Sequence, residues 1–221
     1  MKQASTSLAI IVACLAAAST VAWAGGDGGA ELAGLSIIGW CAASSFLIQW
    51  LAFLPSYRLK TERYYDLTGS LTYIGLTLLA LSTTPAIGPR SAVLGLLVIV
   101  WAGRLGTFLF RRIQAAGSDS RFDSIKTNAW RFLVAWTLQG LWVFLTLCAA
   151  LAAMTAIAPA PMGGLDVLGL GIWIAGFAIE VSADRQKSQF REAHPDRFVD
   201  QGLWAWSRHP NYFGEIVLWI G

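Results

Sequence analysis

Apolar residues along this chain fall into long continuous runs that are separated by short polar segments. We place these runs at 8–24, 32–54, 67–87, 91–110, 132–157, 165–183 and 211–221. The first six approach the roughly 20 residues that a helix needs to cross a bilayer. The runs do not alternate between apolar and polar residues, as the strands of a membrane barrel would. The pattern predicts an all-α integral membrane protein, a bundle of six to seven transmembrane helices.

Composition supports this class. The chain has 221 residues, of which 56% are hydrophobic and only 13% are charged, whereas a soluble domain has about 25% charged residues. Cys14, Cys41 and Cys148 lie inside apolar runs without a CxxC spacing, and the two histidines do not form a ligand pair. We therefore expect neither a disulfide scaffold nor a metal site. The partner we expect is the lipid membrane, and not nucleic acid.

The placement of basic residues predicts the orientation. The connections at 55–66, 111–131 and 184–209 carry most of the lysines and arginines, whereas the opposite connections hold only Arg90. Because basic loops stay on the cytoplasmic side, these three segments and the N-terminus are predicted to be cytoplasmic.

The first run has two interpretations. Lys2, the short apolar run and Ala22-Trp23-Ala24 are compatible with a cleaved signal peptide. We favour a retained helix. The expected organisation is therefore an N-terminal segment over 1–31, comprising a helix or signal peptide with its outer loop, and a transmembrane domain over 32–221.

Acidic and basic residues recur along the end of the sixth run. Glu180, Asp184, Lys187 and Arg191 are spaced by four, three and four residues, so they share one helix face. A carboxylate inside the membrane requires a partner or a ligand. The alternative interpretation is a ladder of salt bridges within the helix.

The start of the last run combines charge with a helix terminus. Pro210 suits the first helical position, and the free N–H groups there can hold a phosphate. Arg208 and His209, which precede it, would add charge-assisted contacts to the phosphate. An ordinary capped helix with an interfacial arginine is the alternative.

Further polar residues lie within the same segments. Asn211 and Glu215 are four residues apart and are predicted to point into the bundle, with Gly214 allowing a close approach to the backbone. Arg104 lies inside the fourth run, where it marks a functional site or reaches toward the surface. Arg121 lies in a loop that could bind a ribose or a phosphate, or form surface ion pairs.

Several strings of residues resemble a known family, a bacterial uncharacterised membrane family related to the steroid 5-alpha-reductase C-terminal domain. The resemblance covers about 45–221 and lies in TERYYDLTGSLTYI, WAGRLGTFLFRRI, SDSRFD, ADRQK with the following FR, and GLWAWSRHPNYFGE. It implies a seven-helix bundle that binds NADPH in a cavity open to the cytosol, and so a bacterial inner-membrane location.

The resemblance also implies roles for residues. Asp184 and Arg191 match residues that hold the dinucleotide, Asn211 and Glu215 match residues that line its cavity, and Arg104 and Arg121 fall near phosphate-binding bases. Together with the polar residues above, the predicted cofactor site comprises Arg104, Arg121, Glu180, Asp184, Lys187, Arg191, Arg208, His209, Asn211, Tyr212 and Glu215.

The chain departs from the steroid-reducing members at the proton donor. Those members carry a Gln-Glu pair in the second span and a Tyr three residues before the arginine of the fourth span. Here Trp50 follows Gln49, and Trp101 stands at the Tyr position. The catalytic residue is unassigned, with Gln49, Trp101 and Glu215 as candidates. Since family members continue beyond the position of Gly221, we expect this chain to be a fragment that ends within the last span.

Three functions fit the sequence. The first is an NADPH-dependent reductase of an activated C=C bond in a lipid-like substrate: a steroid, an enone or an isoprenoid. The second is an S-adenosylmethionine-dependent methyltransferase, because RHPNYFG also resembles the motif of the isoprenylcysteine carboxyl methyltransferases. The third is a non-enzymatic protein that binds or transports lipids. The DRQK string favours the first.

Overall fold

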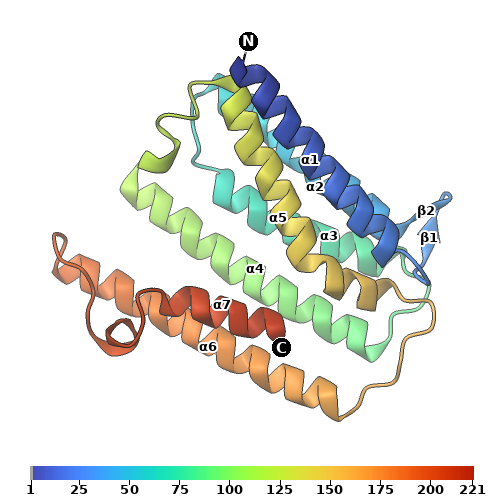
Figure 1. The fold of residues 1–221 in the computed structure, drawn as a ribbon. Coiled ribbons are helices and arrows are strands. Elements are labelled where there is room, and N and C mark those ends of the chain that lie inside the picture. Colours follow the sequence, from blue (N-terminus) through green and yellow to red (C-terminus); the bar gives the residue numbers. More distant parts are fainter. Residues whose placement is uncertain (1) are drawn as a thin grey trace. The chain divides into compact units, whose positions relative to one another are not determined.

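The computed structural model describes residues 2–221, which fold into helices almost throughout (Figure 1). The chain forms two compact units, one that ends at Ala160 and one from Pro161 to Gly221. Five of the helices are long and apolar enough to cross a membrane. The predicted class, an all-α membrane protein, is confirmed. The domain boundary expected between residues 31 and 32 stays a prediction.

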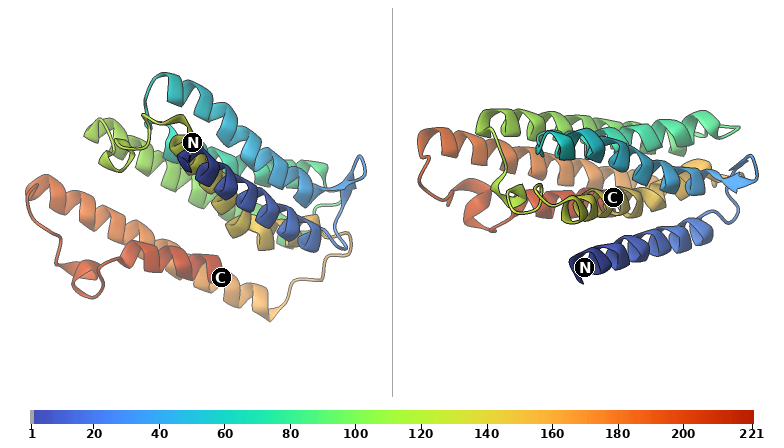
Figure 2. Two further views of the ribbon diagram at one scale, coloured as in Figure 1. Left: turned by 45° about the horizontal axis from the view of Figure 1, so that its top comes forward. Right: turned by 90° about the horizontal axis from the view of Figure 1, so that it is seen from above.

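Unit 1 is a bundle of five long helices, in which α5 packs against each of the others. The two views in Figure 2 show α1 and α5 side by side. The loops 59–64 and 117–128 and the N-termini of α1 and α5 lie at one end, which we call the basic end. The five helices are α1 (Lys2–Gly25), α2 (Ile37–Arg58), α3 (Tyr65–Thr83), α4 (Pro89–Ala116) and α5 (Ala129–Thr155).

Large side chains of α5 form the core of unit 1. Phe132, Trp136, Phe144, Leu147 and Leu151 are each 0% exposed. Successive members of this set are three, four or eight residues apart, so they lie on one side of the helix. The burial of this one side explains why α5 occupies the centre.

Several threonine hydroxyls within unit 1 are satisfied by hydrogen bonds to their own helix. In α3, Thr72 donates to Thr68 O at 2.7 Å and Thr77 donates to Tyr73 O at 2.8 Å. A hydroxyl bonded to its own helix costs little in an apolar environment. These hydroxyl-bearing residues lower the hydropathy of α3, which is not among the five candidate spans.

For two of the predicted runs, one of the two boundaries was wrong. The second was expected to start at residue 32, but 31–36 form a hairpin of β1 (Glu31–Leu32) and β2 (Leu35–Ser36). Its turn has positive φ at Ala33 and Gly34, the geometry that suits a two-residue hairpin loop. The third run ends at Thr83 rather than 87, because Pro85 disfavours helix at the residue before it.

Unit 2 consists of α6 (Gly164–Ala193), a short 3-10 helix η2 (Gly202–Ala205) and α7 (Pro210–Ile220), which folds back antiparallel along α6. The two backbones touch at glycines. A Cβ placed on Gly176 would lie 2.4 Å from Leu218 N, and one on Gly214 would lie 2.5 Å from Glu180 N. Small residues of this kind let membrane helices approach closely. The glycine contacts therefore set the register of α7 on α6.

Candidate functional site

Two carboxylates of α6 are buried within the membrane-spanning helix. Glu180 is 2% exposed and Asp184 is 4% exposed. Glu180 lies one turn from Gly176, on the side of α6 that α7 covers. The close approach that the sequence predicted at Gly214 is made by the backbone of α6 itself. The structure thus places two acids where the packing of α6 and α7 is closest.

The segment before α7 returns to α6 next to these acids. Trp204 Nε1 donates to Ala183 O at 2.9 Å, and Leu203 N donates to Gln186 Oε1 at 2.9 Å. Lys187 Nζ lies 4.8 Å from the centre of the Trp204 ring, a cation–π contact. The η2 segment therefore covers the turn Ala183–Lys187 and packs Trp204 against Lys187.

Helix α7 begins at Pro210, as predicted, with exposed basic residues just before it. The rings of His209 and Tyr212 are 5.4 Å apart. Arg208 and His209 are exposed at the positive end of the helix dipole, where an anion is stabilised. Arg191 is also exposed, but it lies near the C-terminal end of α6.

Asn211 and Glu215 lie beside the packed face of α7. That face consists of Pro210, Gly214 and Leu218, whereas Asn211 and Glu215 are half-buried. The Asn211 Oδ1 atom is buried and has no hydrogen-bond partner within residues 2–221. A buried acceptor without a donor is costly, so this atom is suited to receive a hydrogen bond from a ligand.

The candidates in unit 1 are packed inside the bundle. Gln49 is 0% exposed, and its Nε2 donates to Thr72 Oγ1 at 2.9 Å, a contact between α2 and α3. Trp101 is 2% exposed and meets the Tyr73 ring edge-on at 5.0 Å. Arg104 is half-buried, with its guanidinium carbon 5.1 Å from the Phe108 ring centre. Gln49 thus makes the helix–helix hydrogen bond that is the usual role of a lone amide.

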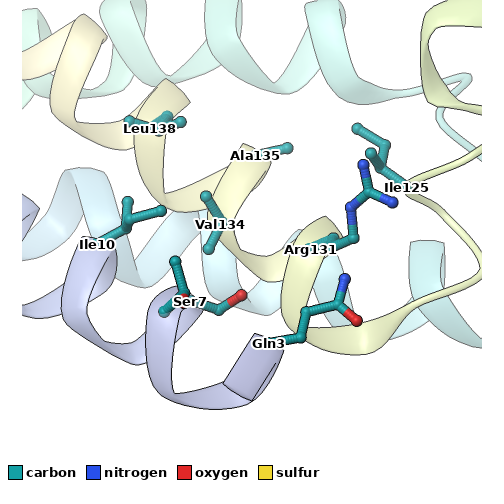
Figure 3. A pocket seen from close by; sticks show the side chains of 9 residues that line it. Gln3, Ser7, Ile10, Ile125, Arg131, Val134, Ala135 and Leu138 are labelled. Atoms are coloured by element: carbon teal, nitrogen blue, oxygen red, sulfur yellow. The ribbon is translucent and has the colours of Figure 1, made fainter.

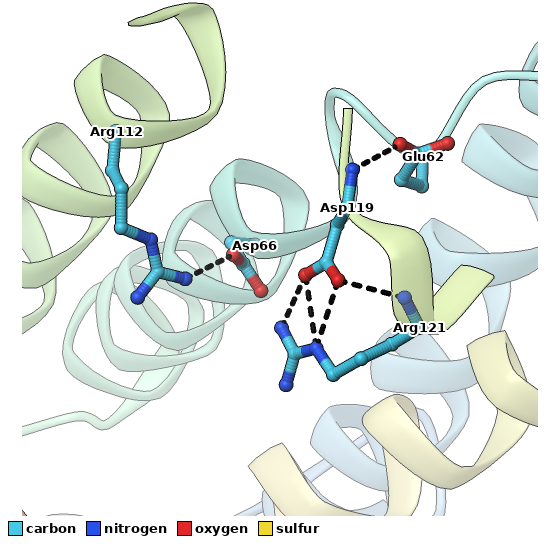
Figure 4. Close-up of polar contacts among 5 residues, drawn as sticks. All are labelled: Glu62, Asp66, Arg112, Asp119 and Arg121. Carbon is cyan, nitrogen blue, oxygen red and sulfur yellow. Dashed lines mark hydrogen bonds and ion pairs between the residues drawn. The ribbon is translucent and has the colours of Figure 1, made fainter. Parts of the chain in front are cut away.

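Arg121 is engaged by an acid of its own loop. Its Nε donates to both Asp119 carboxylate oxygens, at 2.9 and 3.0 Å, and its Nη2 also contacts Asp119. These bonds from Arg121 hold the pKa of Asp119 below its ordinary value. Figure 4 shows the pair beside a second contact, in which Arg112 Nη2 lies 3.7 Å from Asp66 Oδ2. The predicted surface ion pair is the arrangement that the structure shows.

Sequence reasoning missed Glu62, which joins the two loops of the basic end. Its carboxylate accepts a hydrogen bond from Asp119 N at 2.7 Å and from Lys126 Nζ at 2.9 Å (Figure 4 shows the first). Burial raises the pKa of Glu62, but these hydrogen bonds, a bond from its own backbone and the charge of Lys126 together outweigh burial. The pKa of Glu62 therefore lies below its ordinary value. The available signal was one acid among the basic residues Arg58, Lys60 and Arg63.

Comparison with known proteins gives two partial relatives. An uncharacterised protein of fission yeast (Schizosaccharomyces pombe) is 22% identical over 160 residues, which cover 59% of this chain and 46% of that protein. The Delta(14)-sterol reductase ERG24 of Saccharomyces cerevisiae is 33% identical over 75 residues, which cover 28% of this chain and 17% of that protein. The chain thus spans less than half of either relative. No solved structure gives a significant match.

A family model covers most of the chain. Residues 52–221 match the model described as a protein of unknown function, DUF1295, a steroid 5-alpha-reductase-like family. The matched segment runs from the last turns of α2 through all of unit 2. It thus contains every residue of the predicted cofactor site, while α1 lies outside it. On this match the chain belongs to the DUF1295 family.

Proposed function

We propose that this protein is a membrane-embedded, NADPH-dependent reductase of an activated C=C bond in a lipid-like substrate such as a steroid, an enone or an isoprenoid. The observation that carries the proposal is the similarity to a sterol reductase over 75 residues, at 33% identity, in a chain of a steroid 5-alpha-reductase-like family. Five helices that are long and apolar enough to cross a membrane are compatible with a substrate that is dissolved in the bilayer.

The residues of unit 2 suit a dinucleotide. The buried carboxylates of Glu180 and Asp184 can accept hydrogen bonds from ribose hydroxyls. Asn211 Oδ1 is an acceptor that receives no hydrogen bond from residues 2–221. Arg208 and His209 stand at the start of α7, where N–H groups and the helix dipole favour phosphate. Acceptors for hydroxyls and donors for phosphates thus occur on one pair of helices.

NADPH, when bound, supplies the hydride that is added to the β carbon of the alkene. The protein binds and orients the cofactor through Asp184, Asn211 and the α7 N-terminus, and it excludes water from the reacting atoms. A hydrogen-bond donor would stabilise the oxyanion that develops as the hydride is added. A proton delivered to the α carbon, from a protein donor or from water, would then complete the reduction and leave oxidised NADP+. Gln49, Trp101 and Glu215 are the candidates from the sequence for this donor. Gln49 and Trp101 are packed inside unit 1, and Glu215 can donate only when its carboxyl group is protonated. We place the cofactor on the cytoplasmic side of the membrane.

Ligand binding to the purified protein in detergent tests this proposal. Thermal unfolding is measured with NADPH, NADH or S-adenosylmethionine, at a fixed salt concentration, for the wild type and for Asp184→Asn and Asn211→Leu. Asp200→Asn is the matched control, because Asp200 is exposed in the same unit. We expect a rise in Tm with NADPH, and an affinity lowered about tenfold or more in the two site variants, since each loses a buried hydrogen bond to the ligand.

The other outcomes separate the alternatives. A rise in Tm with S-adenosylmethionine alone would favour the methyltransferase. If none of the three ligands raises the Tm, the lipid-binding protein is favoured. If NADPH raises the Tm, the reaction itself is tested by following the oxidation of NADPH at 340 nm in the presence of an enone lipid.

A further inference from the structure

Unit 1 contains a pocket between α1 and α5 that the proposed reductase does not use. Its volume is about 410 Å³, within the range of small-molecule sites. It lies toward the basic end and is lined by residues of the first two to three turns of both helices, together with Ile125 of the preceding loop.

The lining of this pocket is polar at one end and apolar at the other. Figure 3 shows the Gln3 amide and the Arg131 guanidinium at the polar end, and Ile10 and Leu138 at the apolar end. Ile10 is 38% exposed and Leu138 is 46% exposed, so the apolar end opens to the surface of the bundle. In a membrane-spanning bundle, that surface faces lipid tails. The polar end of the pocket thus lies at the helix ends, and the apolar end lies closer to the middle of the bilayer.

The polar end favours an anion. Arg131 is the charged residue of the lining, and no carboxylate is among the described residues that line the pocket. Its Nη1 makes one long contact, 3.5 Å to Ser124 O, which leaves most of the five guanidinium N–H donors for a ligand. The positive dipole ends of α1 and α5 lie at this same end.

We propose that the pocket binds an anionic phospholipid, with its phosphate on Arg131 and Gln3 and its acyl chain along Ile10, Val134 and Leu138. The polar end of the pocket would hold the lipid headgroup and the apolar end would hold its acyl chain. The positive charge of Arg131 is complementary to the negative phosphate. Arginine forms bidentate hydrogen bonds with phosphate. The α1 residues of the lining lie outside the segment 52–221 that matches the family model, whereas the α5 residues lie inside it.

Native mass spectrometry of the detergent-purified protein tests this site. Titrations with phosphatidylglycerol, phosphatidylcholine and inorganic phosphate are compared for the wild type, Arg131→Gln and Ile10→Trp. Arg131→Gln removes the charge, and Ile10→Trp fills the apolar end without changing the charge. Arg63→Gln is the matched control, because Arg63 is an exposed arginine of the basic end that does not line the pocket.

We expect phosphatidylglycerol to bind at least about tenfold more tightly than phosphatidylcholine, because only the former carries net charge. Both pocket variants should lower this affinity about tenfold, while Arg63→Gln leaves it unchanged. Unchanged Tm values without lipid show that the variants fold. Equal binding of both lipids, or phosphate binding as tight as lipid binding, would overturn the proposal. So would an intact mass that lacks residues 1–24, since α1 would then be absent.

Discussion

The two units of this protein are packed in different ways. In unit 1, large side chains such as Phe132 and Trp136 fill the centre of five helices. In unit 2, two helices meet backbone to backbone at Gly176 and Gly214. The polar groups among these bulky side chains are isolated, such as the Gln49 amide, whose Nε2 donates to Thr72 of the neighbouring helix. The glycine contact instead brings two buried carboxylates, Glu180 and Asp184, and the start of α7 together. Of the three buried carboxylates among the described residues, two therefore lie in the smaller unit.

The largest expected effect is the loss of a core side chain in unit 1. Trp136→Ala should lower the free energy of unfolding by about 3–5 kcal/mol, because it leaves a large cavity around a side chain that is 0% exposed. Trp142→Ala on the same helix is the control, since Trp142 is 63% exposed. Denaturant unfolding in detergent measures both. Equal effects of the two changes would show that the core of unit 1 does not depend on side-chain volume.

The second prediction concerns the glycine contact of unit 2. Gly214→Ala should destabilise unit 2 by about 2 kcal/mol or more, because the new Cβ would lie 2.5 Å from Glu180 N and the backbone cannot move aside cheaply. Gly171→Ala on α6 is the matched control, since a Cβ at Gly171 would meet nothing within 4 Å. Protease protection of unit 2 is the measurement. If Gly214→Ala behaves as Gly171→Ala does, the α6–α7 contact is looser than the structure shows.

The third prediction concerns the bond between the loops of unit 1. The pKa of Glu62 is below its ordinary value of 4.5, so its contribution to stability is complete above about pH 4.5 and disappears as the pH falls through the folded value. The pKa of Lys126 is raised above 10.5 by its hydrogen bonds to Glu62 and Asp123, so its contribution disappears only at high pH.

Glu62→Gln should lower the free energy of unfolding by about 1–3 kcal/mol at neutral pH and flatten the decline toward acid. Unfolding curves from pH 3 to 8 measure this, with the exposed Glu31→Gln as the control. If the free energy of unfolding of Glu62→Gln falls toward acid pH as steeply as that of the wild type, other carboxylates cause the fall.

The smallest effect is expected at Arg121, whose side chain is 67% exposed in its pair with Asp119. Arg121→Gln should change stability by about 0–1 kcal/mol, as is usual for exposed ion pairs. The same variant tests the predicted phosphate contact. A loss of NADPH affinity of about tenfold or more would mean that Arg121 leaves Asp119 when the cofactor binds. Little or no loss would remove Arg121 from the cofactor site.

Local sequence predicted the elements well because each depends on neighbouring residues. The run at 211–221 and Pro210 at its start are features of one segment, and α7 spans Pro210–Ile220. The two boundary errors also had local causes, a hairpin at 31–36 and a proline at 85. By contrast, the contact of Glu62 with Asp119 joins residues 57 positions apart, and no spacing rule reaches that far.

The sequence by itself determined the class of the molecule, its helices and the segments that carry charge, because hydropathy and helix period are properties of short stretches of chain. Only the tertiary structure decided what those residues touch. Gly214 packs against the backbone of α6, and Gln49 donates a hydrogen bond to Thr72. Asn211 Oδ1 receives no hydrogen bond from residues 2–221. Such contacts depend on how distant helices pack against each other, and packing is set by the shapes of both surfaces together.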